Sequence, residues 1–182
     1  MVDVFNALTV LGNFLIIPGL TYGSQLALGA LGVTLVYGVL RFSNFAHGET
    51  MAFGAMITIL VTWGLQAAGI SIQPLPTALL AIPVGIAVTV VLTLLIDRFV
   101  YRYHRERKAN PVIFLIVSIG VMFLMGGLIR FMIGPGDQIF FDGTRFILKA
   151  REFKQMTGLD EGLALRMTQT VTIITAVIIV AA

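Results

Sequence analysis

The residues best suited to chemistry lie in one short segment, RFSNFAHGE, which runs from Arg41 to Glu49. It contains an amide at Asn44, an imidazole at His47 and a carboxylate at Glu49, and it separates two long apolar stretches. His47 and Glu49 are two residues apart, and residues at that spacing do not face each other on a helix. The segment is therefore a better candidate for binding a polar group than for acid–base catalysis.

Two interpretations of the segment 41–49 are open from its pattern. It could be a solvated loop in which Asn44 and Gly48 make a turn and the charges face water. It could instead be a discontinuous helix at membrane depth, which is tolerated only where the broken backbone lines a cavity or is buried in protein. A helix that restarts near His47 would direct its positive end at an anionic group such as a carboxylate.

Other catalytic and metal-binding patterns are absent from the sequence. There is no cysteine, and the two histidines are His47 and His104, so a thiolate site is excluded and a histidine-rich metal site is disfavoured. No Walker A loop, GxSxG elbow or HExxH motif occurs. We therefore expect a chain that is not an enzyme and that holds no metal and no cofactor.

Charged residues are distributed in a way that indicates a membrane protein. Asp, Glu, Lys and Arg make up 12% of the chain, about half of what a soluble domain carries. They are missing altogether from 121 of the 182 residues, in the runs 4–40, 50–96, 109–129 and 167–182. A surface so poor in charge excludes a soluble enzyme and a nucleic-acid-binding domain. The expected fold class is an all-α, polytopic transmembrane protein.

The positions of the helices are predicted from charges, prolines and glycines. A helix crosses the hydrocarbon core in about 20 residues. We expect a short apolar helix at 4–17, ended by Pro18 and Gly19, and a polar connection at 134–162. About five spans are predicted, at 21–40, 50–69, 76–96, 111–131 and 163–182. The last span lacks a closing charge, so residues 1–182 are expected to be the N-terminal part of a single transmembrane domain.

A cluster of cations predicts the orientation of the chain in the membrane. The connection 97–110 carries five of them, Arg98, Arg102, Arg105, Arg107 and Lys108. Short loops rich in Lys and Arg remain in the cytoplasm, so this connection is expected there. With Arg41 included, the cations would number six on each side of the membrane, and the prediction therefore depends on the compactness of the cluster.

Small residues recur at helical spacing near the start of the chain. Gly19, Gly23 and Ala27 are four residues apart and would share one face of a helix. Small residues allow helices to approach each other closely in lipid. We expect this face to serve helix packing.

The polar segment and its surroundings resemble the LivH-type permeases of branched-chain amino acid ABC transporters. The resemblance rests on Tyr37-Gly38, on NFAHGE at 44–49, and on Gly54-Ala55. It continues through the basic loop and a Pro-opened span that contains Ile119-Gly120, and it covers residues 20–136 well. One departure is Gly126-Gly127, where the family leads us to expect a Gln-Asn type of pair.

The resemblance implies a permease subunit of an ATP-binding-cassette importer in the cell inner membrane. It implies a LivM-like second permease subunit, two cytoplasmic ATPase subunits that hydrolyse the ATP, and a periplasmic substrate-binding protein. It favours the discontinuous helix over the loop, with Asn44, Phe45, His47, Gly48 and Glu49 along the translocation path. It also places the helix that couples to the ATPase beyond residue 182. The alternatives are a urea or short-chain amide permease, a membrane-embedded enzyme, and a structural membrane protein.

Overall fold

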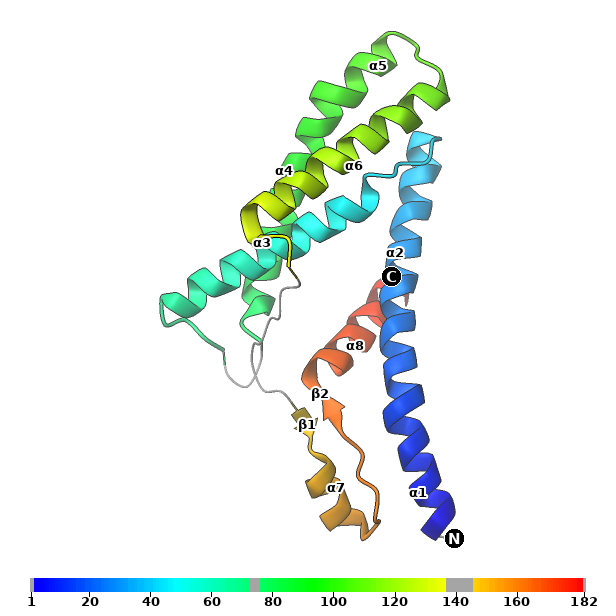
Figure 1. Ribbon diagram of the computed structural model, residues 1–182, viewed down its shortest axis with the longest axis vertical. Coiled ribbons are helices and arrows are strands. Elements are labelled where there is room, and N and C mark those ends of the chain that lie inside the picture. Colours follow the sequence, from blue (N-terminus) through cyan, green and yellow to red (C-terminus); the bar gives the residue numbers. More distant parts are fainter. Residues whose placement is uncertain (1, 73–75, 137–145, 182) are drawn as a thin grey trace. The chain divides into compact units, whose positions relative to one another are not determined.

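The fold is built from apolar helices, as the charge pattern predicts. A computed structural model describes residues 2–72, 76–136 and 146–181, and most of them are helical (Figure 1). A shorter apolar helix, α8, spans Met167–Ala181. Four described helices are long and apolar enough to cross a membrane: Asp3–Leu40, His47–Ala67, Ala78–Glu106 and Pro111–Ile133. These findings confirm the all-α, polytopic class.

The chain divides into two compact units. The first comprises Met1–Gly32 with Thr144–Ala182, and the second comprises Val33–Gly143. The first unit holds α1 (Val2–Leu11), η1 (Gly12–Ile16), the start of α2 (Ile17–Leu40) and the elements after residue 145. The second holds the end of α2 and the helices α3 to α6. The polar segment lies in the second unit.

The prediction that Pro18 and Gly19 end the first helix is wrong. The elements α1, η1 and α2 follow one another without a break, and η1 is a π-helical turn in which the Ile17 amide donates to the Gly12 carbonyl. A proline within an α-helix clashes with the carbonyl four residues earlier, which for Pro18 belongs to Phe14. That carbonyl lies in the wider π turn, and the widening relieves the clash, so the helix continues to Leu40.

Helix α3 (His47–Ala67) packs against both α4 (Ala78–Ile96) and α6 (Pro111–Ile133) (Figure 1). The start of α6 is as predicted, because Asn110 caps it by accepting from the Val112 amide at 3.2 Å. Pro111 occupies the first helical turn, where its missing N–H costs nothing. Predicted and observed bounds of α3, α4 and α6 differ by no more than three residues at either end.

The predicted connection 97–110 is mostly helical, which corrects its description as a loop. After α4 come η2 (Asp97–Tyr101) and α5 (Arg102–Glu106), so the helix runs on to Glu106. The Arg105 guanidinium donates to both oxygens of Asp97 at 2.7 Å, and Arg102 pairs with Glu106 at 2.8 Å. The pair Arg102–Glu106, at a spacing of four residues, supports an exposed helix. The turn between α5 and α6 therefore comprises only residues 107–110 and contains Lys108 at φ 51°.

Close packing of α3 on α4 depends on two glycine–threonine pairs. A Cβ at Gly54 would lie 3.0 Å from Oγ1 of Thr89, and a Cβ at Gly85 would overlap Oγ1 of Thr58. Each threonine hydroxyl donates to the carbonyl four residues earlier in its own helix, at 2.9 Å for Thr58 and 2.7 Å for Thr89. Glycine and threonine at a spacing of four thus form the interface in both helices.

The stripe of small residues that was predicted to pack against a helix lies on an exposed surface. A Cβ built at Gly19 or Gly23 meets no described atom within 4 Å, and Ala27 is also exposed. The packing role of these three residues stays a prediction.

The polar connection contains regular structure that the sequence did not predict. Strand β1 (Phe146–Leu148) pairs antiparallel with β2 (Leu165–Arg166), with Phe146 opposite Arg166. Helix α7 (Ala150–Thr157) follows β1 in the sequence and precedes β2. It ends at Gly158, which has a left-handed φ of 69°. Because β2 pairs with β1, α8 begins at Met167, four residues later than predicted.

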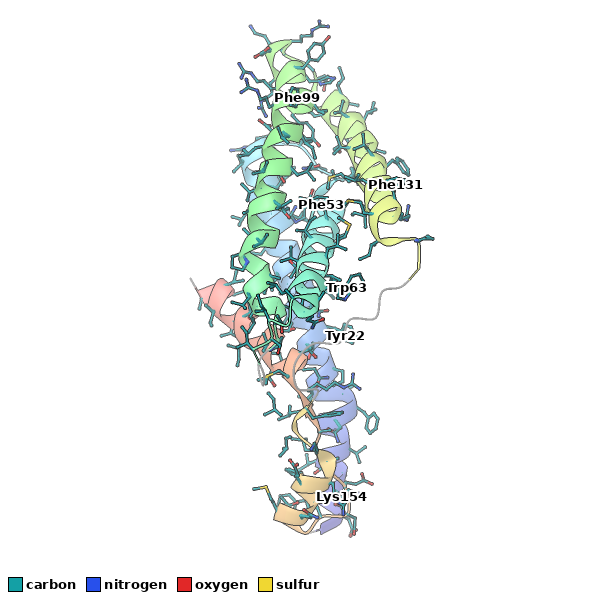
Figure 2. The ribbon with its side chains drawn as sticks, turned by 90° about the vertical axis from the view of Figure 1, so that its left-hand side faces the viewer. Tyr22, Phe53, Trp63, Phe99, Phe131 and Lys154 are labelled. Atoms are coloured by element: carbon teal, nitrogen blue, oxygen red, sulfur yellow. The ribbon has the colours of Figure 1, made fainter. Side chains whose placement is uncertain are left out.

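Apolar side chains cover the outer faces of the helices. Phe131 on α6 is 89% exposed and Phe99 on η2 is 73% exposed, whereas Phe53 on α3 is only 5% exposed (Figure 2). Exposed phenylalanines of this kind would be unfavourable in water and suit a lipid environment.

Candidate functional site

The polar segment begins with a sharp end to α2. The helix stops at Leu40, and Arg41 adopts a left-handed conformation with φ 58° while its amide donates to the Tyr37 carbonyl at 2.9 Å. This conformation costs a non-glycine residue about 1–2 kcal/mol. The chain thereby turns out of the helix, and residues 41–46 are not helical.

Phe42 anchors the segment in the core of the second unit. Its side chain is buried, and its ring centroid lies 5.6 Å from that of Tyr101 and 5.1 Å from that of Phe114. Aromatic pairs at these distances add to the stability gained from burial alone. The non-helical residues 41–46, called the polar break below, are therefore held by packing against η2 and α6. They are not a free surface loop.

Asn44 organises the turn that leads into α3. Its side-chain oxygen accepts from the Ala46 amide at 3.1 Å and from the Tyr101 hydroxyl at 3.2 Å. Its carbonyl accepts from the His47 amide at 3.3 Å. The bond to Ala46 is the local pattern for which asparagine is favoured in turns. The Asn44 side chain thus connects the break to Tyr101 of η2.

Ser118 of α6 supports the same segment from the other side. Its hydroxyl accepts from the Phe45 amide at 3.2 Å and donates to the Leu115 carbonyl at 2.7 Å. The residue is fully buried, with 0% of its surface exposed. Ser118 was not predicted to be part of the site, because its only signal in the sequence is that it is a lone serine in an apolar span.

A pocket of about 430 Å³ lies where α2, the break and α3 meet. Residues from all three parts line it: Val33, Val36, Tyr37, Ser43, Asn44, Phe45, His47 and Gly48. The Nε2 atom of His47 is buried and has no hydrogen-bond partner among the described residues. An unpaired buried polar atom costs about 1–3 kcal/mol, so one residue of the pocket lining, His47, carries a nitrogen with unused hydrogen-bonding capacity.

Glu49 lies in the first turn of α3 but is directed at α6. A Cβ built at Gly126 would lie 3.3 Å from its Oε1 atom. No hydrogen bond or ion pair of the Glu49 carboxylate occurs within the described parts of the chain. Its negative charge in the first turn is favourable for the helix. Four of the five predicted path residues therefore line the pocket, and Glu49 does not.

The five cations of the basic cluster differ in their surroundings. Arg102 and Arg105 are paired with carboxylates, and the Arg107 guanidinium lies 4.2 Å from the centre of the Tyr103 ring. Arg98 and Lys108 are exposed and form no ion pair within the described ranges. None of the described parts contains three or more His, Cys, Asp or Glu side chains that could hold a metal ion together.

These features define a multi-pass helical membrane protein whose second long helix is separated from the first by a packed polar break. The chain belongs to the family described as "Branched-chain amino acid transport system / permease component", which matches residues 15–182. This membership agrees with the resemblance identified from residues 37–55.

Two relatives illustrate the similarity. The high-affinity branched-chain amino acid transport system permease protein BraD of Pseudomonas aeruginosa is 37% identical over 121 residues, which are 66% of this chain and 37% of BraD. The protein LivH of Escherichia coli K12, described in the same words, is 32% identical over 123 residues, 65% of this chain and 38% of LivH. The match thus spans well under half the length of these relatives. No solved structure matches the chain.

Proposed function

We propose that this chain forms part of the translocation path of an ATP-driven importer for branched-chain amino acids, in the cell inner membrane. The names of BraD and LivH as branched-chain amino acid permeases support this substrate class. The family is one of transport permeases, which favours transport over a membrane-embedded enzyme, a structural protein or a urea permease.

The single observation that carries the proposal is the polar break with its pocket. Asn44, His47 and Gly48 line a cavity at the N-terminus of α3, between two apolar helices. The amides of a helix N-terminus and its positive dipole end suit a carboxylate, and His47 adds an imidazole to the same lining. Val33 and Val36 supply an apolar wall that suits a branched side chain.

The partners of this permease follow from its class. We propose a LivM-like second permease subunit, two cytoplasmic ATPase subunits and a periplasmic substrate-binding protein. ATP is hydrolysed on the ATPase subunits, and this chain supplies the path. Within it, Asn44, Phe45, His47, Gly48 and Glu49 form the polar segment that the substrate passes.

Transport by the complete complex tests the proposal. Proteoliposomes that contain this chain, its partner permease and the ATPase subunits are loaded with ATP, and uptake of radiolabelled leucine is measured with the binding protein outside. We expect ATP-dependent uptake that valine and isoleucine inhibit and urea does not. Uptake of urea in place of leucine, or no uptake of either, would refute the assignment.

A further inference from the structure

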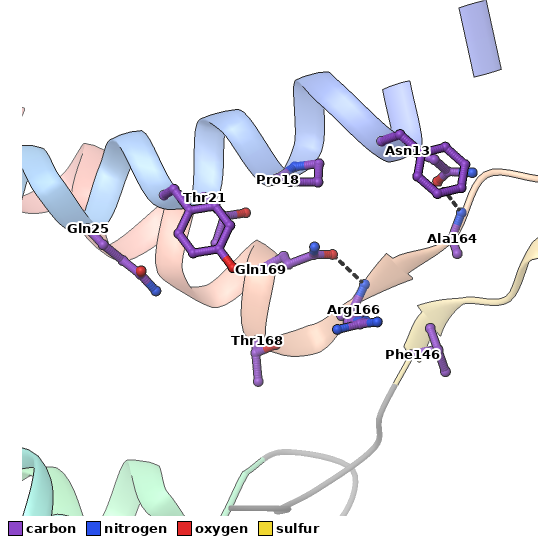
Figure 3. A pocket seen from close by; sticks show the side chains of 11 residues that line it. Asn13, Pro18, Thr21, Gln25, Phe146, Ala164, Arg166, Thr168 and Gln169 are labelled. Atoms are coloured by element: carbon purple, nitrogen blue, oxygen red, sulfur yellow. Dashed lines mark hydrogen bonds between the residues drawn. The ribbon is translucent and has the colours of Figure 1, made fainter. Parts of the chain in front are cut away.

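A second pocket, of about 500 Å³, lies entirely within the first compact unit. It is formed by the η1 turn and the start of α2 on one side, and by β1, β2 and the first turn of α8 on the other (Figure 3). It shares no residue with the pocket at the polar break. Its volume falls in the range that small-molecule sites occupy, about 300–1,000 Å³.

Side-chain hydrogen bonds hold this pocket together. The Asn13 amide nitrogen donates to the Gly162 carbonyl at 2.6 Å, and its oxygen accepts from the Ala164 amide at 2.9 Å. The Gln169 side-chain oxygen accepts from the Arg166 amide at 3.2 Å (Figure 3). The chain that leads into β2 is therefore attached to η1, and the backbone of Arg166 is attached to α8.

The charge of the pocket comes from one residue. Arg166 is the single charged side chain among the 11 that line it, and none of the others is acidic. Its guanidinium has no ion pair or side-chain hydrogen bond with any described residue. The side-chain nitrogens of Gln25 and Gln169 add further donors on the same lining. A guanidinium is suited to bind a carboxylate through two parallel hydrogen bonds.

Aromatic and proline rings line another part of the pocket, beside the polar side chains of Asn13, Thr21 and Thr168. Phe14, Pro18 and Phe146 supply rings without charge, and Tyr22 adds an aromatic ring that is 67% exposed. A ligand that fits both parts carries a carboxylate at one end and an apolar group at the other. We propose that this pocket is a second binding site for the transported amino acid, with Arg166 holding its carboxylate. The identity of the ligand rests on the proposed function, whereas the preference for a carboxylate rests on the pocket.

Binding is tested on the assembled transporter in phosphatidylcholine nanodiscs without ATP, by equilibrium dialysis with radiolabelled leucine. All variants carry His47→Ala, which weakens binding at the polar break. Arg166→Gln should lower the affinity at least tenfold, Arg166→Lys should lower it less, and Arg151→Gln, an exposed arginine on α7 outside the pocket, should leave it unchanged. Leucinamide, which lacks the carboxylate, should not compete.

Equal affinity of the Arg166→Gln variant, or competition by leucinamide as effective as by leucine, would overturn the inference. When phosphatidylglycerol is added to the nanodiscs, retention of this lipid that depends on Arg166, with no leucine binding, would overturn the inference in favour of a lipid headgroup. Leucine uptake by the wild-type complex without binding that depends on Arg166 would refute this site alone. Binding of isovalerate that depends on Arg166, without uptake of any branched-chain amino acid, would support the carboxylate pocket and refute the proposed function.

Discussion

The carboxylate of Glu49 lies against the backbone of α6 at Gly126, where an added Cβ would be 3.3 Å from Oε1 and 3.4 Å from Oε2. Position 126 is one of the two glycines at which this sequence departs from the pair expected for LivH-type permeases. The absence of a side chain there leaves room for Glu49. Glu49 of the polar segment therefore lies against Gly126, a position at which this sequence departs from the family pattern.

This relationship predicts that Gly126 is sensitive to substitution. Gly126→Leu should displace the Glu49 carboxylate and lower transport, because the larger side chain needs the space that the carboxylate occupies. Gly127→Leu is the matched control, since a Cβ at Gly127 meets nothing within 4 Å. Leucine uptake is measured against the amount of protein in the membrane, and equal uptake by both variants would contradict the prediction.

His47 is predicted to matter for transport and not for folding. Its buried Nε2 has no described partner, so His47→Ala removes an unsatisfied group and should leave thermal stability unchanged or slightly higher. Uptake should fall by about tenfold or more, which corresponds to about 1.4 kcal/mol of lost interaction. His104→Ala alters the chain's other histidine, which does not line the pocket, and serves as the control. Full uptake by His47→Ala would show that the His47 side chain has no role in the translocation path.

The hydrogen bond between Tyr101 and Asn44 is predicted to stabilise the break. Tyr101→Phe should lower the free energy of unfolding by about 1 kcal/mol, while the bond from Ala46 to Asn44 remains. In a double-mutant cycle, Asn44→Ala with Tyr101→Phe should be less destabilising than the sum of the single changes. Tyr103→Phe, at a tyrosine that is 49% exposed, should have little effect. Strict additivity of the two single changes would show that the bond contributes nothing.

The interface of α3 and α4 is predicted to depend on Gly85. Gly85→Ala adds a Cβ that overlaps Oγ1 of Thr58 and lies 3.2 Å from the Gly54 carbonyl oxygen. Overpacking of this kind costs about 1–3 kcal/mol, and the unfolding temperature in detergent should fall. Gly120→Ala, where the added Cβ meets nothing, should be neutral or stabilising. Adding Thr58→Ala to Gly85→Ala should restore part of the loss, and no recovery would point to a different cause.

The connection 97–110, which carries the basic cluster, is predicted to face the cytoplasm. Asp97 and Glu106 neutralise two of the five cations, and Arg98, Arg107 and Lys108 keep a net positive charge at this end of the helix. The chain has no native cysteine, so Ser71→Cys and Lys108→Cys can each be labelled alone. An impermeant maleimide added to intact cells should label position 71 and not position 108. The reverse pattern would invert the topology.

The sequence by itself determined the membrane class and the location of the polar break. Charge-free runs longer than about 20 residues leave few alternatives to spanning helices, and the break is visible because its polar residues interrupt them. The motif at 44–49 and its neighbours also indicated the family. These conclusions depend on residues that are close together in the chain.

Only the tertiary structure decided which residues meet. Pro18 was predicted to end a helix, and the π turn before it showed that the helix continues. Ser118 supports Phe45 from 73 residues away, and Gly126 receives Glu49 across a helix interface. Arg166 became a candidate binding residue through the pocket that it lines with η1 and α2. Apolar helices in lipid present similar residues on every face, so their periodicity does not reveal which faces pack against each other.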